Sequence, residues 1–468
     1  MKTENTPNTS SVSQESDAGL PVWPGIVIGF SAAIAMWLVW YPLHLPGLQL
    51  PVEITGPLLM LVMLIAIALG SKPLGRRAAP AGLLAGLASA LVNLLLLGNQ
   101  LSKTSPDGTA LAGAEGLKPD APLIIAGFIG ASLVIGLIAG FIGSKLGKGT
   151  QTKHINWLAR FGVAAVLAMF PLVIAGGAVT SSGAGMSVPD WPGTYGSNMF
   201  LYPIGLMADP RIFLEHTHRL FGTLVGLTTM VLMIAVLIKK PSTFARILAV
   251  VLFVAVCIQG LLGALRVTEN NPGLGVAHGV FAQLVLAAAA LLAATLTASW
   301  QNKPAVNLDS AGRARKLANL AVPALIIQLA LAALYRHLGS QHALLTHMAF
   351  SLIVTGLLAM LAFSLYHIEK ETPNHRLYKK LGNALLHGVG FQFVLGFAAF
   401  MLLRDHEASS RVVGYDQLDT APDIPVAGVI VATLHQANGA ALLMFAVLAA
   451  AWTRRIKPAP EPAHAPES

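Results

Sequence analysis

Cysteine and charge are scarce in this chain of 468 residues. Its single cysteine, Cys257, lies in an apolar stretch, which excludes an intrachain disulfide and a centre held by several thiolates. Only 11% of the residues are charged and 55% are hydrophobic, whereas about a quarter are charged in typical soluble proteins. Neither the alternating strands of a membrane barrel nor the basic start of a cleaved signal peptide is present. These absences indicate a helical membrane protein whose chemistry does not depend on thiols.

Long apolar runs are frequent instead. A run of about eighteen or more apolar residues is a candidate membrane helix, because a helix satisfies its own backbone while it crosses lipid. The sequence therefore predicts an all-α polytopic membrane protein with about twelve transmembrane helices. The expected helices cover residues 24–43, 54–70, 79–98, 121–143, 160–178, 212–238, 244–265, 274–299, 316–337, 343–367, 382–403 and 428–452.

The formal net charge of +9 follows the expected membrane topology. Most of the 30 Lys and Arg residues fall in the two tails and in alternate loops, while the intervening loops hold most of the acids. Excess Lys and Arg mark the cytoplasmic side, so we expect both termini in the cytoplasm and the protein in the inner membrane of the cell. Membrane lipid is the expected surrounding, and no nucleic-acid partner is expected.

Composition divides the chain into five parts. A polar tail covers residues 1–22. Residues 23–150 form a four-helix membrane extension with almost no buried charge, which favours a structural or assembly role. Residues 151–300 and 301–457 read as two four-helix repeats, which predict an eight-helix bundle with two related sites. Residues 458–468 form a polar tail.

Four histidines occupy equivalent places in the two repeats, each near the start of a helix that begins on the non-cytoplasmic side. They are His218 and His278 in the first repeat, and His347 and His435 in the second. An ionisable group at membrane depth costs roughly 2.5–3.5 kcal/mol, so such residues usually have a function. Zinc would need a third protein ligand, which no H-x-x-x-H spacing provides, whereas two imidazoles suit the two faces of haem iron. The residues therefore predict two haem centres in the outer leaflet. The alternative is histidines that only hydrogen-bond a neighbouring helix.

Glu215 distinguishes the first repeat from the second. It lies three residues before His218, on the same helix face, where it could act as an acid or base beside the iron ligand. The alternative is a first-turn glutamate favoured by the helix dipole. Leu344 stands at the matching place before His347, so only the first site is predicted to be catalytic. His216 is expected on another face, at the membrane interface.

Arginines lie at the outer ends of several of these helices. Arg219, Arg266 and Arg336 are predicted to bind haem propionates in bidentate fashion, and Arg404 is a fourth candidate. The alternative for each is a side chain that extends to the interface without a ligand.

Other polar residues have less specific expectations. Gln259 and Gln392 are equivalent in the repeats and are predicted to hydrogen-bond between helices, with cofactor contact as the alternative. His337, at a helix end, is expected to be solvated. The glycine-rich loop 176–192 leads to Glu215 and is predicted to form a lid over the first site, with a re-entrant loop as the alternative.

Several motifs together resemble the haem A synthase family. They are GGAVTSSGAGMSVPDWP in the first outer loop, E-x-x-H-R from Glu215 to Arg219, QGLLGALRVT at 259–268, AHG at 277–279, THM at 346–348 and TLHQANGAALL at 433–443. The resemblance covers about residues 160–455, and the N-terminal four helices lie outside it.

The resemblance implies an oxidoreductase that converts the C8 methyl group of haem O to a formyl group, giving haem A. His218 and His278 would hold the substrate haem O, with Glu215 as the catalytic residue. His347 and His435 would hold a haem b that passes electrons to an unidentified acceptor. The implied partners are haem O, the enzyme that produces it and the assembly of a terminal oxidase, and a homo-oligomer is left open.

The sequence departs from the family in one respect and leaves two other functions open. Many bacterial relatives carry a cysteine pair in the first outer loop, and its absence here argues against thiol-based transfer through that loop. A carrier with two b haems that exchanges electrons with quinol would need the same histidines but not Glu215. A membrane transporter with buried histidines would bind no haem.

Overall fold

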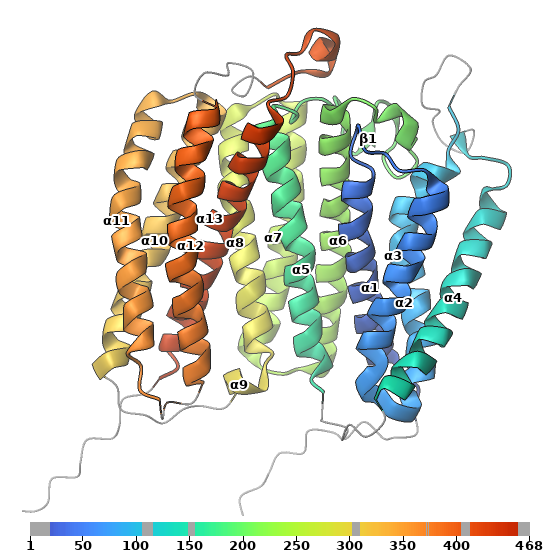
Figure 1. The fold of residues 1–468 in the computed structure, drawn as a ribbon, viewed down its shortest axis with the longest axis horizontal. Helices are drawn as coiled ribbons and strands as arrows, with labels where there is room; N and C mark the ends of the chain where they lie inside the picture. Colours follow the sequence, from blue (N-terminus) through green and yellow to red (C-terminus); the bar gives the residue numbers. More distant parts are fainter. Residues whose placement is uncertain are drawn as a thin grey trace, which may run out of the picture.

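Long, nearly parallel α-helices form almost the whole protein (Figure 1). The computed structural model describes residues 19–104, 116–147, 155–301, 309–370, 372, 374–403 and 412–456. The helices are α1 (Val22–Leu43), α2 (Val52–Ser71), α3 (Ala78–Leu101), α4 (Ala121–Leu146), α5 (Trp157–Ser181), α6 (Pro210–Lys239), α7 (Thr243–Thr268), α8 (Pro272–Thr295), α9 (Ala298–Gln301), α10 (Asp309–Leu338), α11 (Gln341–Tyr366), α12 (His375–Leu403) and α13 (Val426–Thr453).

The all-α polytopic fold that the sequence predicts is confirmed. The described chain has eleven apolar helical stretches long enough to cross a membrane. One of them, Val52–Gly98, contains both α2 and α3, which are joined by the 3-10 turn Lys72–Arg77 with Gly75 at a φ of 54°. All twelve predicted helices are therefore present, and among the described α-helices only the four-residue α9 was not expected.

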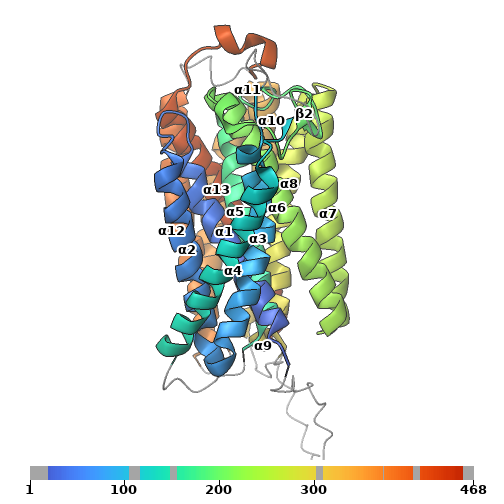
Figure 2. The ribbon, with the colours of Figure 1, turned by 90° about the vertical axis from the view of Figure 1, so that its right-hand side faces the viewer.

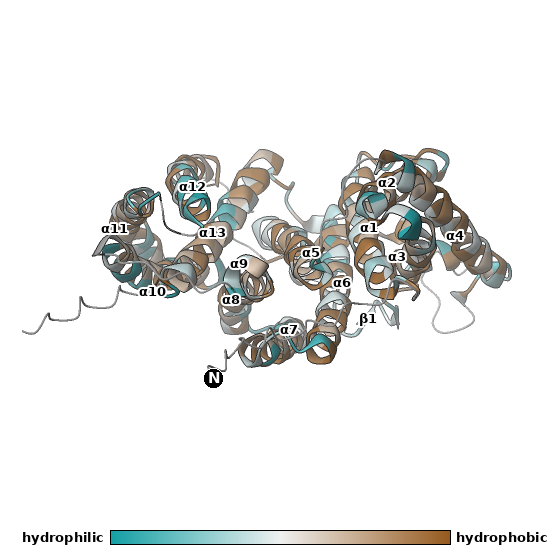
Figure 3. Ribbon diagram, turned by 90° about the horizontal axis from the view of Figure 1, so that it is seen from below, coloured by the Kyte–Doolittle hydropathy of each residue, from teal (hydrophilic) through white to brown (hydrophobic). Residues whose placement is uncertain are grey.

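The helices form three groups in a row, as the view from below shows (Figure 3). The N-terminal helices α1–α4 lie at one end, α5–α8 in the middle and α10–α13 at the other end. Within the middle group α5 packs on α6 and α8, and α7 packs on the same two helices; α10–α13 close a similar ring. The two rings meet where α8 and α5 contact α13 and where α8 contacts α10.

Small residues allow the N-terminal helices to approach one another closely. Gly82 and Gly86 on α3 face Gly136 and Gly140 on α4, and a methyl group added at any of them would collide with backbone of the other helix. Membrane helices gain no hydrophobic driving force from one another, so close backbone contact of this kind is what holds them together. In Figure 2, which views the row of helix groups from one end, the N-terminal group lies nearest the viewer.

The outer loops of the two rings are joined. Residues 182–209, between α5 and α6, include the small hairpin β1 (Gly193–Thr194) and β2 (Ser197–Asn198). The loop before α13 carries the 3-10 turn η5 (Tyr415–Thr420), which rises above the helix ends in Figure 2. Its Val413 N–H donates to Gly183 O at 2.9 Å, and Gly414 pairs with Met186 as a β-bridge. The second repeat thus helps to cover the first.

Candidate functional site

The four histidines meet in the two pairs that the repeats predict. His218 on α6 faces His278 on α8, with ring centres 6.4 Å apart and ring planes at 79°. His347 on α11 faces His435 on α13, with ring centres 6.3 Å apart and planes at 75°. Two separate parts of the chain have therefore built nearly the same two-imidazole geometry.

This spacing fits a metal between the two rings. A metal–imidazole bond of about 2 Å on each side, with roughly 1 Å from each nitrogen to its ring centre, gives about 6 Å between centres. Among the described residues no group of three or more His, Cys, Asp or Glu is arranged to hold a metal ion. The pairs therefore suit a metal whose other ligands come from outside the protein, as the porphyrin nitrogens of haem do.

Glycines allow three of the four imidazoles to lie directly on a neighbouring helix. The contacts are Gly176 of α5 with His218, Gly263 of α7 with His278, and Gly396 of α12 with His435. A methyl group added at these glycines would lie 2.9, 3.0 and 2.8 Å from the ring Cε1 atoms. These distances are too short for ordinary van der Waals contact, so the glycines set how closely each ring approaches.

Two glutamines, each one turn before one of these glycines, orient the neighbouring histidines. Gln259 Nε2 donates to His278 O at 2.9 Å and lies 3.1 Å from its Nδ1. Gln392 O lies 3.2 Å from His435 Nδ1. Both glutamines bond between helices, as predicted. At His435 an Nδ1–H that donates to the backbone carbonyl orients the ring so that Nε2 is the atom available to a metal. This Nε2 also lies 3.2 Å from Gln392 Nε2.

The structure adds Gln328, which the sequence reasoning missed. Its backbone oxygen lies 3.0 Å from His347 Nδ1, and its Nε2 donates to His347 O at 2.9 Å. The signal was available, because Gln328 stands four residues before Ala332 as Gln259 stands four before Gly263.

His218 differs from the other three. It faces the backbone of Leu172 without a hydrogen bond of normal geometry, so its Nδ1 is buried and unpartnered.

Glu215 is buried beneath the outer loop, with 3% of its surface exposed. Its Oε2 accepts from the Val188 N–H at 2.9 Å, and its Oε1 forms an ion pair with Arg219 Nη2 at 2.8 Å. Arg219 also donates to Val188 O at 2.9 Å and Asp190 O at 2.6 Å. The pair therefore fastens the loop to α6, and the carboxylate lies one turn from His218.

The predicted propionate ligands differ in what they contact. The hydrogen bonds of Arg219 go to Glu215 and the loop, and Arg336 Nη2 donates to Thr180 O at 2.6 Å. The Arg266 side chain lies against Gly185 and Gly275, and its guanidinium makes no hydrogen bond or ion pair with the described residues. Its guanidinium is the best placed of the three to bind a carboxylate. Arg404 lies outside the described residues.

Two other histidines do not lie where they were predicted. His216 is fully buried rather than interfacial, because the hairpin folds over it and Thr194 Oγ1 lies 3.1 Å from its Nδ1. His337 is half-buried rather than solvated, because it packs on α8, where a methyl group at Gly275 would lie 2.8 Å from its Nδ1. Both predictions were wrong because other segments of the chain bury these histidines, and the pattern of a single helix does not reveal such contacts.

The outer loop contacts several of these groups at once. Its Val188 binds Glu215 and its Gly185 lies on the Arg266 guanidinium, as a lid over the first site requires. The Tyr195 hydroxyl donates to Ser187 O within the same loop. Burial, followed by the charges of nearby acidic groups, raises the pKa of Tyr195 above its ordinary value, so this hydroxyl stays protonated.

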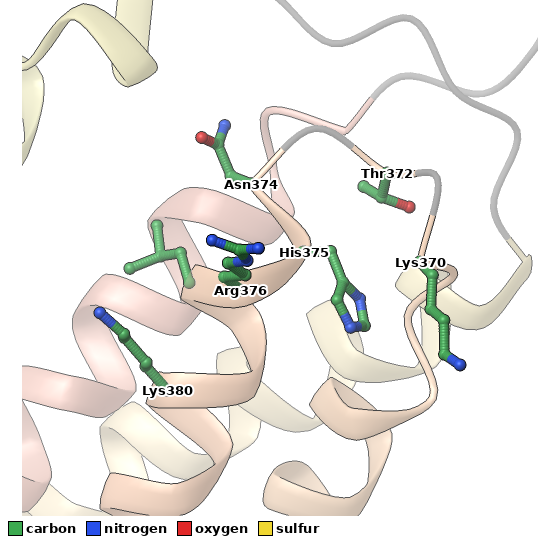
Figure 4. Close-up of a pocket in the computed structure, with 7 residues that line it drawn as sticks. Lys370, Thr372, Asn374, His375, Arg376 and Lys380 are labelled. Atoms are coloured by element: carbon green, nitrogen blue, oxygen red, sulfur yellow. The ribbon is translucent and has the colours of Figure 1, made fainter.

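A cavity of about 500 Å³ lies at the opposite end of the bundle, at the start of α12 (Figure 4). It is lined by Lys370, Thr372, Asn374, His375, Arg376, Leu377 and Lys380. Its side chains point in several directions, and none belongs to either histidine pair. This basic surface is typical of a helix end at the level of lipid headgroups and is separate from the site described above.

Fold and site together define a class: a polytopic helical membrane protein with one pair of facing histidines in each of two helix rings. Within it, residues 207–344 match the family of cytochrome oxidase assembly proteins (COX15-CtaA). The matched range contains Glu215, His218 and His278, so the resemblance inferred from the motifs is confirmed for this part of the chain. Searches of curated proteins and of solved structures gave no match.

Proposed function

We propose that the protein oxidises the C8 methyl group of haem O to the formyl group of haem A for the assembly of a terminal oxidase. The match of residues 207–344 to cytochrome oxidase assembly proteins supports this proposal. The observation that carries it is the difference between the two histidine pairs. One pair has the buried Glu215–Arg219 ion pair beside it, whereas Leu344 replaces the carboxylate at the other.

In this proposal His218 and His278 hold haem O, and His347 and His435 hold haem b. Bound haem supplies the redox chemistry of the iron. Arg266 binds a propionate and thereby fixes which edge of the porphyrin faces Glu215, with Arg219 and Arg336 as further contacts. Glu215 accepts a proton at the oxygen not held by Arg219, because a carboxylate oxygen that accepts one hydrogen bond retains a second lone pair. The loop 182–209 excludes bulk water from this carboxylate.

The second pair provides an outlet for electrons. Oxidation of the methyl group to a formyl group takes up the oxygen atom of one water molecule and releases electrons and protons. The α8–α13 contact places the two rings next to one another. The electrons pass on to an acceptor whose identity is not part of the proposal. Haem O and its producing enzyme are the proposed partners, in an inner membrane with both chain termini in the cytoplasm.

Replacement of Glu215 tests the catalytic role. We expect Glu215→Ala to abolish haem A formation while both haem sites remain filled, because neither iron ligand is changed. Haems extracted after co-expression with a haem O-producing enzyme are separated by chromatography, with Leu344→Ala at the equivalent place of the second repeat as the matched control. Normal haem A yield from Glu215→Ala would contradict the assignment.

A carrier with two b haems is the second candidate, because the two pairs have almost the same geometry. It predicts two b-type haems, electron exchange with quinol and no conversion of haem O in the same co-expression experiment. A transporter predicts no haem absorption spectrum in the purified protein.

A further inference from the structure

The helix that carries the proposed catalytic residues has a second face that the site does not use. On α6, Phe213, Thr217 and Phe221 follow one another at intervals of four residues and so form one stripe. Glu215 lies on the opposite side of the helix, and His218 lies between Glu215 and the stripe. The stripe is closed to lipid, since Phe213 and Phe221 are 0% and 1% exposed.

Three aromatic residues at the outer end of α1 cover this stripe. The ring centre of Trp37 lies 5.3 Å from that of Phe221, in edge-on geometry at 70°. Tyr41 lies 5.6 Å from both Phe213 and Phe221, and Trp40 lies 6.3 Å from Phe213. These are the separations at which aromatic rings interact favourably. The aromatic rings therefore interlock α1 with α6 directly behind the site.

α1 is itself held firmly by α3. Methyl groups added at Gly25 or Gly29 would collide with α3, so the two helices are in close contact. Higher up, Trp37 Nε1 donates to Asn93 Oδ1 at 3.1 Å, and Asn93 Nδ2 donates to Ser89 Oγ at 3.2 Å. Asn93, Trp37 and Phe221 thus form a continuous connection from α3 through α1 to α6.

The same group of helices also supports the outer loop. Gly98 near the end of α3 contacts the backbone oxygen of Phe200, so closely that any side chain there would collide with it. Phe200 follows the hairpin whose Thr194 reaches His216. The N-terminal helices therefore contact both the helix that carries Glu215 and the loop that covers it.

The second repeat has no such support. No N-terminal helix packs extensively on α10–α13 in the described chain. On α11, which corresponds to α6, the counterparts of the stripe are His342, Thr346 and Phe350, of which His342 and Thr346 are exposed and Phe350 is half-buried. The covering by α1 is thus specific to the repeat that contains Glu215.

We propose that helices α1–α4 are a positioning module for the first site, with Trp37 and Tyr41 as its positioning residues. The module fixes the rotation and height of α6, and so keeps Glu215 and His218 in register with the bound porphyrin. The arrangement of helices in a membrane is set by side-chain packing, because lipid is as apolar as the helix surfaces. The contacts between the aromatic rings of α1 and α6 therefore determine the position of α6. A displacement of about 1 Å at a reacting group can cost a factor of about 10² in rate. This inference rests on the proposed function for the role of the site, whereas the way α6 is held follows from its contacts with α1.

The test uses the full chain with Trp37→Ala, Trp37→Phe and the control Trp23→Ala. Trp23 lies on the same helix at its other end, where Lys239 Nζ lies 5.7 Å from its ring. We expect Trp37→Ala to alter the electron paramagnetic resonance signal of the first-site haem and leave the second-site signal unchanged. Haem A formation should fall by roughly 10- to 100-fold through kcat. Trp37→Phe keeps a ring against Phe221 and should restore most of the activity, and Trp23→Ala should change neither signal.

Hydrogen exchange of haem-free protein separates this inference from the proposed function. Trp37→Ala should increase exchange of the backbone amides of 213–221 on α6 and leave those of α11 unchanged, whether or not the protein makes haem A. Unchanged exchange and an unchanged first-site signal in Trp37→Ala would overturn the proposal. Equal changes at both sites would also overturn it, because they indicate general loss of stability. If Trp37→Ala does not accumulate, Asn93→Leu removes the hydrogen bond to Trp37, together with those to Ser89 and Met36, and leaves the aromatic rings in place. It is measured in the same way, with a smaller change expected on α6 alone.

Discussion

The two helix rings share the geometry of their histidine pairs and differ in nearly everything around them. The ring centres lie 6.4 and 6.3 Å apart, and glutamine carbonyls or amides orient three of the four imidazoles. In the part of the chain that the structure describes, only the first ring has a buried carboxylate–arginine pair, a hairpin loop over it and a third group of helices behind it. The repeated helical unit has thus given both rings the same arrangement of histidines, while the residues around each pair set the role of that site.

The largest effect should come from removing one ligand from each pair. We expect His278→Ala to lose the first haem and His435→Ala the second, so that each variant retains about half of the haem, because a single imidazole holds iron weakly in the absence of its partner. Haem-to-protein ratios and absorption spectra measure this. Loss of both haems in either variant would show that the two rings do not act as separate sites.

Arg219→Ala should have the next largest effect, and only on the first ring. Removal of the arginine leaves the buried Glu215 carboxylate without its charge partner, which typically costs about 3–5 kcal/mol, and also frees the loop carbonyls of Val188 and Asp190. We expect a lower thermal midpoint and loss of haem A formation. The matched change in the second ring is Met348→Ala, which should leave both unchanged. An Arg219→Ala variant of wild-type stability would show that the ion pair does not hold the loop.

A methyl group added beside a ligand tests whether the two rings respond independently. Gly263→Ala should weaken the first haem and Gly396→Ala the second, each by about 1–3 kcal/mol, because overpacking displaces the imidazole. Haem titration of the purified apoprotein provides the affinities. Gly260→Ala and Gly390→Ala are controls on the same two helices, since nothing lies within 4 Å of a methyl group there. A change at the opposite ring in either variant would contradict independence.

The smallest effect is expected from Gln328→Leu. It removes the amide hydrogen bond to His347 O but keeps the backbone carbonyl that faces the imidazole, so a loss of about 0.5–1.5 kcal/mol is expected. Redox titration and haem affinity of the second site measure it, and Gln259→Leu gives the corresponding change at the first. Identical behaviour of the two variants would mean that ligand support, like ligand spacing, is the same in both rings.

Much of the fold followed from the sequence because lipid imposes simple requirements. A membrane-spanning segment must be long, apolar and helical, so the twelve helices could be located from composition alone. The histidine pairs could be predicted as well, since equivalent residues in repeated units take equivalent places. Gln328 shows the limit: its spacing to Ala332 repeats that of Gln259 to Gly263, but its role became clear only once the structure placed its helix beside His347.

The sequence by itself determined the class of protein, the twelve helices and the four histidines, all through local composition and repetition. Tertiary structure decided the rest. It buried His216 beneath a hairpin, assigned the Arg219 guanidinium to Glu215 and the loop, and set α1 behind α6. These outcomes depend on contacts between segments far apart in the chain, and local pattern constrains such contacts only weakly. The difference between the two rings therefore arises mainly from what the folded chain packs around each pair.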